Sequence, residues 1–133
     1  MGLAEHNKQV VDRVYKLIFA GDFDGFFACF DEDAMLIEPE TLPYGGTFRG
    51  ISNVKAAIMR MASHWSTFSL DFHEVLASDK TVAAVTTFNA TSAKTGKKVS
   101  IPMVEIWEVK GDKIASVRPI YGDTMLVIKA LSD

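Results

Sequence analysis

Two acidic residues lie in apolar stretches where a carboxyl group can act as an acid or a base. Glu38 follows an apolar run at residues 35–37 and precedes Pro39. An apolar environment disfavours the ionised carboxylate and raises its pKa, which suits the group to proton transfer near neutral pH. The pattern predicts Glu38 as a candidate base at the mouth of a pocket. The alternative is a solvated acid at the end of a strand.

Glu105 is the second acidic residue of this kind. Its face of the predicted strand is otherwise apolar, because strand alternation puts three neighbours on the same side: Met103, Trp107 and Val109. A charge among apolar neighbours needs a partner or a proton. An ion pair with Arg118 on the next strand is the structural alternative to catalysis. The same alternation places Arg118 on the outer face, opposite to Tyr121.

The loop Pro43-Tyr44-Gly45-Gly46 supplies a hydroxyl group that could cap the mouth of a cavity and donate a hydrogen bond. A plain turn aromatic is the alternative for Tyr44. His64 and His73 have no partners at the spacing of metal ligands, so no metal site is predicted. The sequence also contains no phosphate-binding loop and no dinucleotide fingerprint, and no cofactor is predicted.

The composition is that of a folded soluble protein with one domain, residues 1–133. Hydrophobic residues make up 48% of the 133 residues, charged residues 23%, and the net charge is −3. Because no basic stripe is present, nucleic-acid binding is not expected. The apolar runs are too short for a membrane span, and the N-terminus has no secretory core. With Cys29 as the single cysteine, a cytoplasmic location is predicted.

The order of the elements predicts an α+β fold. Helical spacing of apolar residues indicates a helix over 5–19, a short helix beginning near residue 23 and a third beginning near residue 52. A polar turn at 31–33 precedes a strand over 34–38, and 47–49 form a brief strand. From residue 67 the period becomes two, which predicts four long strands joined by three hairpins. We expect a cone-shaped, curved antiparallel sheet wrapped around the three N-terminal helices, with a ligand cavity between the layers.

Several short motifs then carry a resemblance that covers nearly the whole chain. They are Val10-Val11-x-Arg13, Ala20–Gly25, Phe30-x-Glu32-Asp33-Ala34, Glu38-Pro39, Gly46–Gly50, Gly111–Ile114 and Arg118–Asp123. In these motifs the chain resembles the nuclear transport factor 2-like (NTF2-like) superfamily, also called cystatin-like. Within it, the chain is most similar to the SnoaL-like polyketide cyclases and the ketosteroid isomerases.

The resemblance to the isomerases implies roles for particular residues. Glu38 holds the position of the general base, before the proline that ends the first strand. Glu105 matches the carboxylic acid that donates to an oxyanion, if Trp107 matches the aromatic that follows it. The position of the isomerase tyrosine is Val14, and Tyr15 lies about a quarter-turn further around the helix. The resemblance to the cyclases instead implies an acid/base role for Asp123, after Tyr121-Gly122.

These observations predict a small cofactor-independent enzyme of the isomerase or cyclase type that acts on an apolar, carbonyl-bearing molecule. The catalytic candidates are Glu38 and Asp123. The candidates for substrate binding are Tyr15, Tyr44, Glu105, Trp107 and Tyr121. The alternative is a binding module that holds an apolar ligand without chemistry. Apolar residues on the outer face of the sheet, Val104, Ile106 and Ile120, predict a homodimer through that face.

Overall fold

A computed structural model describes residues 2–133. The chain forms helices and strands in this order: α1 (Leu3–Phe19), α2 (Phe23–Ala28), β1 (Phe30–Glu38), β2 (Gly46–Arg49), α3 (Ile51–Ser63), β3 (Trp65–Ala77), β4 (Thr81–Ser92), β5 (Lys98–Lys110), β6 (Lys113–Tyr121) and α4 (Thr124–Leu131). The predicted α+β class is confirmed, and so are the three N-terminal helices and the long C-terminal strands.

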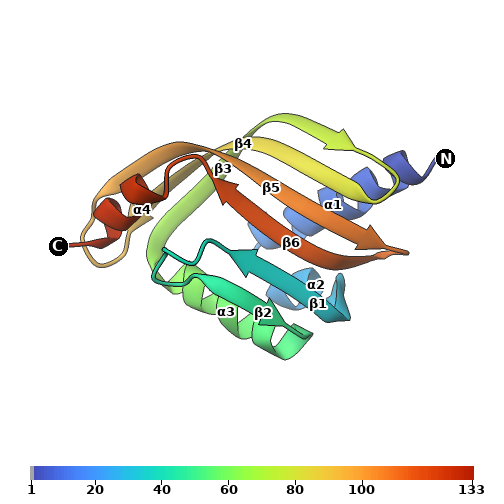
Figure 1. The fold of residues 1–133 in the computed structure, drawn as a ribbon, viewed down its shortest axis with the longest axis horizontal. Helices are drawn as coiled ribbons and strands as arrows, with labels where there is room; N and C mark the ends of the chain where they lie inside the picture. The colour runs from blue at the N-terminus through green and yellow to red at the C-terminus, as the bar shows by residue number, and fades with distance from the viewer. Residues whose placement is uncertain (1) are drawn as a thin grey trace.

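The six strands form one unclosed sheet in the order β2-β1-β6-β5-β4-β3. The strands β3 to β6 form the predicted meander of antiparallel neighbours. The pairing of β1 with β6 is parallel, so the sheet is mixed at this point. Figure 1 shows the sheet curving over α1 and α2, with α3 beside β1 and β2 and α4 at the end remote from the N-terminus.

The helices bury the apolar faces that the sequence pattern predicts. Val11, Val14 and Tyr15 of α1 are buried in the main core. Asp22 caps α2 by accepting a hydrogen bond from the backbone N–H of Gly25, at 2.9 Å. The phenylalanine stripe of α2 continues into the same core, which fixes this helix against the inner face of the sheet.

Two parts of the chain differ from the prediction. The predicted turn at 31–33 belongs to β1, because an irregularity between Phe30 and Met35 lets both ends of this strand pair with β6. The helix α4 was not predicted at all. It covers only eight residues, and the packing of Val127 and Ala130 into a second core cluster stabilises it.

The outer face of the sheet carries the apolar residues that predict a dimer. Val104 of β5 pairs in register with Ile120 of β6, and Ile120 is 47% exposed. Dimerisation through this face stays a prediction, as does the cytoplasmic location. Within residues 2–133, no helix is long and apolar enough to cross a membrane.

Candidate active site

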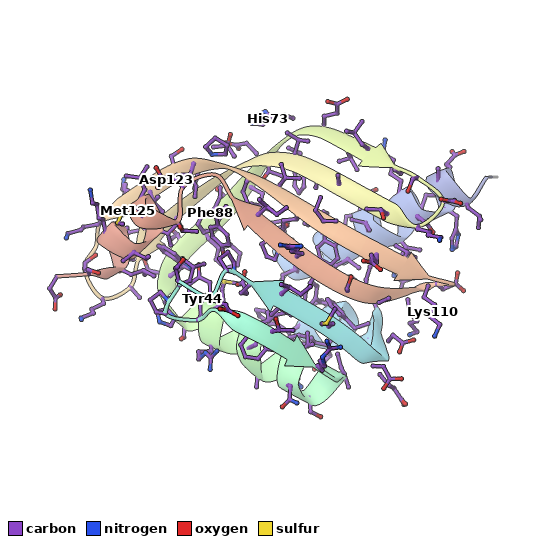
Figure 2. The ribbon with its side chains drawn as sticks, viewed as in Figure 1. Tyr44, His73, Phe88, Lys110, Asp123 and Met125 are labelled. Atoms are coloured by element: carbon purple, nitrogen blue, oxygen red, sulfur yellow. The ribbon has the colours of Figure 1, made fainter. Side chains whose placement is uncertain are left out.

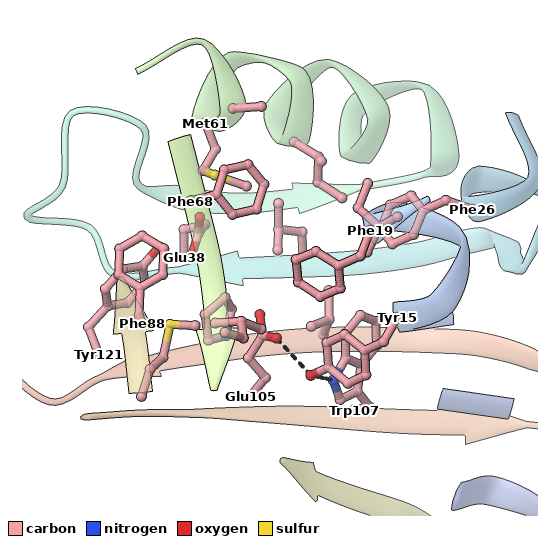
Figure 3. A pocket seen from close by; sticks show the side chains of 18 of the residues that line it. Tyr15, Phe19, Phe26, Glu38, Met61, Phe68, Phe88, Glu105, Trp107 and Tyr121 are labelled. Atoms are coloured by element: carbon pink, nitrogen blue, oxygen red, sulfur yellow. Dashed lines mark hydrogen bonds between the residues drawn. The ribbon is translucent and has the colours of Figure 1, made fainter. Parts of the chain in front are cut away.

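A pocket of about 100 Å³ lies between the inner face of the sheet and the first three helices (Figure 3). Its walls are mainly aromatic and aliphatic, and no Lys, Arg or His side chain belongs to them. Phe19 and Phe23 line the pocket and are 46% and 41% exposed, so the opening lies where α1 ends and α2 begins. Glu38 and Glu105 are the only residues of the lining that carry carboxyl groups.

Glu38 enters the pocket from the last position of β1, where it pairs with Gly46 of β2. It is only 4% exposed, and its Oε1 atom has no hydrogen-bond partner in the described part of the chain, residues 2–133. Burial and the negative charge of Glu105 raise the pKa of Glu38 to about 8, while the Tyr121 hydroxyl acts in the opposite direction. The alternative of a solvated acid is therefore wrong. Glu38 is a buried carboxyl group that faces the predicted cavity.

Glu105 enters the same pocket from β5 and takes part in a short hydrogen-bond chain. The Tyr15 hydroxyl lies 2.7 Å from Glu105 Oε1, and Trp107 Nε1 donates to Tyr15 Oη, also at 2.7 Å (Figure 3). Burial raises the pKa of Glu105 to about 7, and the hydrogen bond from Tyr15 opposes this shift. The ion-pair alternative is wrong, because Arg118 is exposed and pairs with Ile106 on the outer face.

The position of Tyr15 on α1 explains how it reaches Glu105. Val14, at the position of the isomerase tyrosine, is fully buried in the core. Tyr15 is turned toward β5, and its ring packs edge-on against Trp107 at 5.4 Å and Phe72 at 4.7 Å between ring centroids. Burial and the charge of Glu105 raise the pKa of Tyr15 well above its usual range, so this hydroxyl stays protonated.

Tyr44 does not lie at the cavity mouth as predicted. It is fully buried, and its ring packs in the second core cluster, 5.3 Å from the ring of His64. Its hydroxyl lies 3.0 Å from that of Tyr121, which does line the pocket. Burial raises the pKa of both phenols, Tyr44 and Tyr121. Tyr44 therefore contacts the pocket indirectly, through Tyr121.

Asp123 lies outside the pocket, at the start of α4 (Figure 2). It is exposed, and its Oδ1 atom accepts a hydrogen bond from the backbone N–H of Leu126 at 3.1 Å. The chain turns away from the pocket at Gly122, whose N–H donates to the carbonyl oxygen of Pro102 at 2.7 Å. A side chain at Gly122 would meet that oxygen at 2.6 Å, so this close turn requires glycine.

The structure thus brings five of the predicted site residues together in one pocket: Tyr15, Glu38, Glu105, Trp107 and Tyr121. Sequence reasoning missed much of the apolar wall, including Phe19, Phe68 and Phe88. Strand alternation puts Phe88 on the buried face of β4 and was a usable signal for it. Within residues 2–133, no group of three His, Cys, Asp or Glu side chains is placed to hold a metal ion.

Known structures share this fold across nearly the whole chain. An NTF2-like protein of unknown function from Burkholderia pseudomallei K96243 has a TM-score of 0.88 at 23% identity, over 96% of this chain and 98% of that chain. A protein described as a SnoaL-like polyketide cyclase, from Jannaschia sp. CCS1, has a TM-score of 0.86 at 14% identity, over 99% and 95%. A protein with a ketosteroid isomerase-like fold from Catenulispora acidiphila DSM 44928, in complex with trimethylamine, has a TM-score of 0.75 at 12% identity, over 91% of each chain.

These likenesses show the fold, and a comparison with the sequences of curated proteins finds no significant match. The sequence itself matches the profile of a protein family over most of its length. That match is to the SnoaL-like domain and covers residues 11–117, from the middle of α1 to the middle of β6. The predicted resemblance is confirmed: the chain belongs to the SnoaL-like domain family, and its fold is that of NTF2-like proteins.

Proposed function

We propose that this protein is a small cofactor-independent enzyme of the isomerase or cyclase type, which moves a proton on an apolar, carbonyl-bearing molecule. The observation that carries the proposal is the pair of carboxyl groups, Glu38 and Glu105, in an otherwise apolar and phenolic pocket. Their pKa values, about 8 and about 7, lie near neutral pH. A group that titrates there both accepts and returns protons efficiently.

The pocket also supports a substrate class. Removal of a proton next to a carbonyl group requires one base and a donor for the oxygen that becomes negative. Two carboxyl groups of opposite protonation state meet both requirements. The cavity of about 100 Å³ is smaller than the cavity of roughly 150 Å³ that holds benzene, so it favours a small ligand. We infer a small, mainly apolar ketone or aldehyde as the substrate.

A second candidate function is binding without turnover, and one observation favours it. The carboxyl groups have no cationic partner in the lining, and aromatic rings surround them. A small organic amine would pair with a carboxylate and lie against the aromatic rings, where cation–π attraction adds to its binding. The trimethylamine bound by the structural relative from Catenulispora acidiphila provides a direct probe for this candidate.

Deuterium exchange tests the leading proposal. The protein is incubated in D₂O with a panel of small enolisable ketones, and incorporation next to the carbonyl group is followed by NMR. We expect exchange with at least one ketone and its loss in Glu38→Gln and Glu105→Gln. Asp123→Asn is the matched control, because it removes an acidic group that lies outside the pocket.

The outcomes separate the two functions. Exchange that is equal in the wild type and in both glutamine variants contradicts the enzyme proposal. Thermal stabilisation by trimethylamine, with no exchange on any ketone, supports the binding module instead. If neither effect is seen, both functions are rejected for these ligand classes.

A further inference from the structure

The two carboxyl groups of the pocket have different hydrogen-bond environments, and this difference defines their roles. An indole N–H is a donor only, so Tyr15 Oη accepts the hydrogen bond from Trp107 Nε1. The single hydrogen of the Tyr15 hydroxyl is then directed at Glu105 Oε1, which is its one acceptor within residues 2–133. The direction of the chain from Trp107 through Tyr15 to Glu105 is thereby fixed.

A hydrogen bond donated to a carboxylate stabilises its ionised form, and burial without a donor destabilises it. Glu105 receives such a bond at Oε1, whereas Glu38 Oε1 receives none within residues 2–133. The Tyr121 hydroxyl also acts on the Glu38 carboxyl group, but burial outweighs it and the pKa of Glu38 stays raised. The other titratable groups that face the pair are phenols: Tyr15 from α1, Tyr121 from β6 and, through Tyr121, Tyr44. Because no cation lines the pocket, a negative charge on either glutamate disfavours a second one on the other.

We propose that Glu105 is the ionised base of the pair and Glu38 the protonated acid, with Tyr15 and Trp107 as the positioning residues that set this order. The assignment rests on the proposed function and deepens it. It reverses the roles that the resemblance to the ketosteroid isomerases implies, in which Glu38 is the base and Glu105 the donor.

The reaction then balances with these two groups alone. The free Oε2 atom of Glu105 takes the proton from the carbon next to the substrate carbonyl group. The electron pair of that C–H bond forms a carbon–carbon double bond, and the carbonyl π electrons move to oxygen, which takes the proton of Glu38. In the second half of the step, the enol oxygen returns that proton to Glu38 as Glu105 Oε2–H delivers its proton to carbon. Delivery to a different carbon of an unsaturated ketone gives an isomer.

The order of ionisation is measured without any substrate. The protein is labelled with [δ-¹³C]glutamate, and the two pocket signals are assigned by their loss in Glu38→Gln and Glu105→Gln. A pH titration by ¹³C NMR then follows each carboxyl group separately. We expect Glu105 to ionise at lower pH than Glu38, and Glu105→Gln to lower the pKa of Glu38, because it removes a negative neighbour. If Glu38 ionises first, the assignment is overturned.

Removal of the Tyr15 hydroxyl tests the positioning role. In Tyr15→Phe we expect the pKa of Glu105 to rise by about one unit or more, the size of a lost hydrogen bond to a charged group. Tyr44→Phe is the matched control, because it removes another buried phenol hydroxyl, which bonds Tyr121 rather than a carboxyl group. An unchanged Glu105 titration in Tyr15→Phe rejects the role of Tyr15.

Two further measurements keep the test decisive. If Tyr15→Phe does not fold, Trp107→Phe removes the donor to Tyr15 and keeps a smaller aromatic ring in its place. A smaller rise in the pKa of Glu105 is then expected, and no rise rejects the role of Trp107. The titration order is also independent of turnover. If Glu105 ionises first but no ketone undergoes exchange, only the proposed function is rejected. If exchange occurs but Glu38 ionises first, only the assignment of roles is rejected.

Discussion

The two ends of the pocket are built from the same kinds of side chain but are completed differently. At the end next to α1, three side chains form a continuous series of hydrogen bonds. Trp107 Nε1 donates to Tyr15 Oη at 2.7 Å, and Tyr15 Oη donates to Glu105 Oε1, also at 2.7 Å. At the end next to the 39–45 loop, Tyr44 and Tyr121 pair with each other. Among residues 2–133, Glu38 Oε1 and Trp65 Nε1 have no hydrogen-bond partner, and the Trp65 ring packs in the same core cluster as Tyr44.

This difference shows where a ligand would change the molecule most. A buried polar atom without a partner costs roughly 1–3 kcal/mol, so such atoms are uncommon and usually have a role. The hydrogen bonds among Trp107, Tyr15 and Glu105 at the α1 end hold Glu105 in one orientation and favour its ionised form. The incomplete end leaves Glu38 able to form a new hydrogen bond, which a carbonyl oxygen would accept from its protonated form. The α1 end therefore fixes the position of Glu105, and the Glu38 end is where a ligand would form a new hydrogen bond.

The largest expected effect is on catalysis. Glu38→Gln and Glu105→Gln should each lower ketone exchange by about 100- to 10,000-fold, the range that general acid–base groups contribute. Gln keeps the shape of Glu but transfers no proton, so both ends of the pocket should be equally essential. Exchange rates by NMR provide the measurement, with Asp123→Asn as control. A large loss of exchange in only one of the two variants would contradict a mechanism that needs both carboxyl groups.

The next largest effect is on the pH dependence of stability. The pKa of Glu38 is about 8 in the folded protein against 4.5 for an ordinary glutamate, so the folded state binds its proton more tightly than the unfolded state does. The contribution of Glu38 to stability is thus fully present below pH 4.5 and is lost as the pH rises through about 8. Glu38→Gln should be more stable than the wild type at pH 9, by about 5 kcal/mol, and nearly equal to it at pH 4.5.

Urea unfolding of both proteins at pH 4.5, 7 and 9 measures this difference. The same experiment on Glu105→Gln should give the same sign with a smaller change, because the pKa of Glu105 rises only to about 7. A stability gap that does not widen with pH would show that Glu38 is not held in its protonated form.

A smaller effect separates the two tyrosine arrangements. Tyr15→Phe leaves both Trp107 Nε1 and Glu105 Oε1 without a partner and should cost about 2 kcal/mol of unfolding free energy. Tyr44→Phe leaves only the Tyr121 hydroxyl, which lines the pocket, and should cost about 1 kcal/mol. Denaturant unfolding at one pH compares the two. Equal costs would mean that the hydrogen bonds of Tyr15 contribute no more to the free energy of unfolding than the bond between Tyr44 and Tyr121.

The smallest effect gives a baseline outside the pocket. Asp123→Ala removes the cap of α4 and should cost about 1 kcal/mol, whereas Asp123→Asn keeps a capping oxygen and should cost only a few tenths. Neither variant should change the titration of Glu38 or Glu105. A changed titration would show that the end of the sheet near α4 is coupled to the pocket.

Much of the fold was predictable because the local spacing of apolar residues indicates where the helices and strands lie. The phenylalanine spacing of α2 and the alternation in β3 to β6 reflect one face packed on the core and one face toward solvent. The placement of Glu105 among Met103 and Trp107 followed from the same alternation. The turn predicted at 31–33 was wrong: these residues belong to β1, which pairs with β6 on both sides of them, at Phe30 and Met35. That pairing joins residues about eighty positions apart, so local patterns do not reveal it.

The sequence by itself predicted the fold class and limited the pocket carboxyl groups to three candidates, Glu38, Glu105 and Asp123. Helix and strand periods carry these predictions, since they decide which side chains point inward. Only the tertiary structure decided the partners of those groups. Tyr15 and Glu105 are 90 residues apart, and their contact depends on how α1 lies across β5. The exclusion of Asp123 depends on the close turn at Gly122, which directs the chain out of the pocket. Hydrogen-bond partners and burial set the charge of a carboxyl group, and both come from residues distant in the chain.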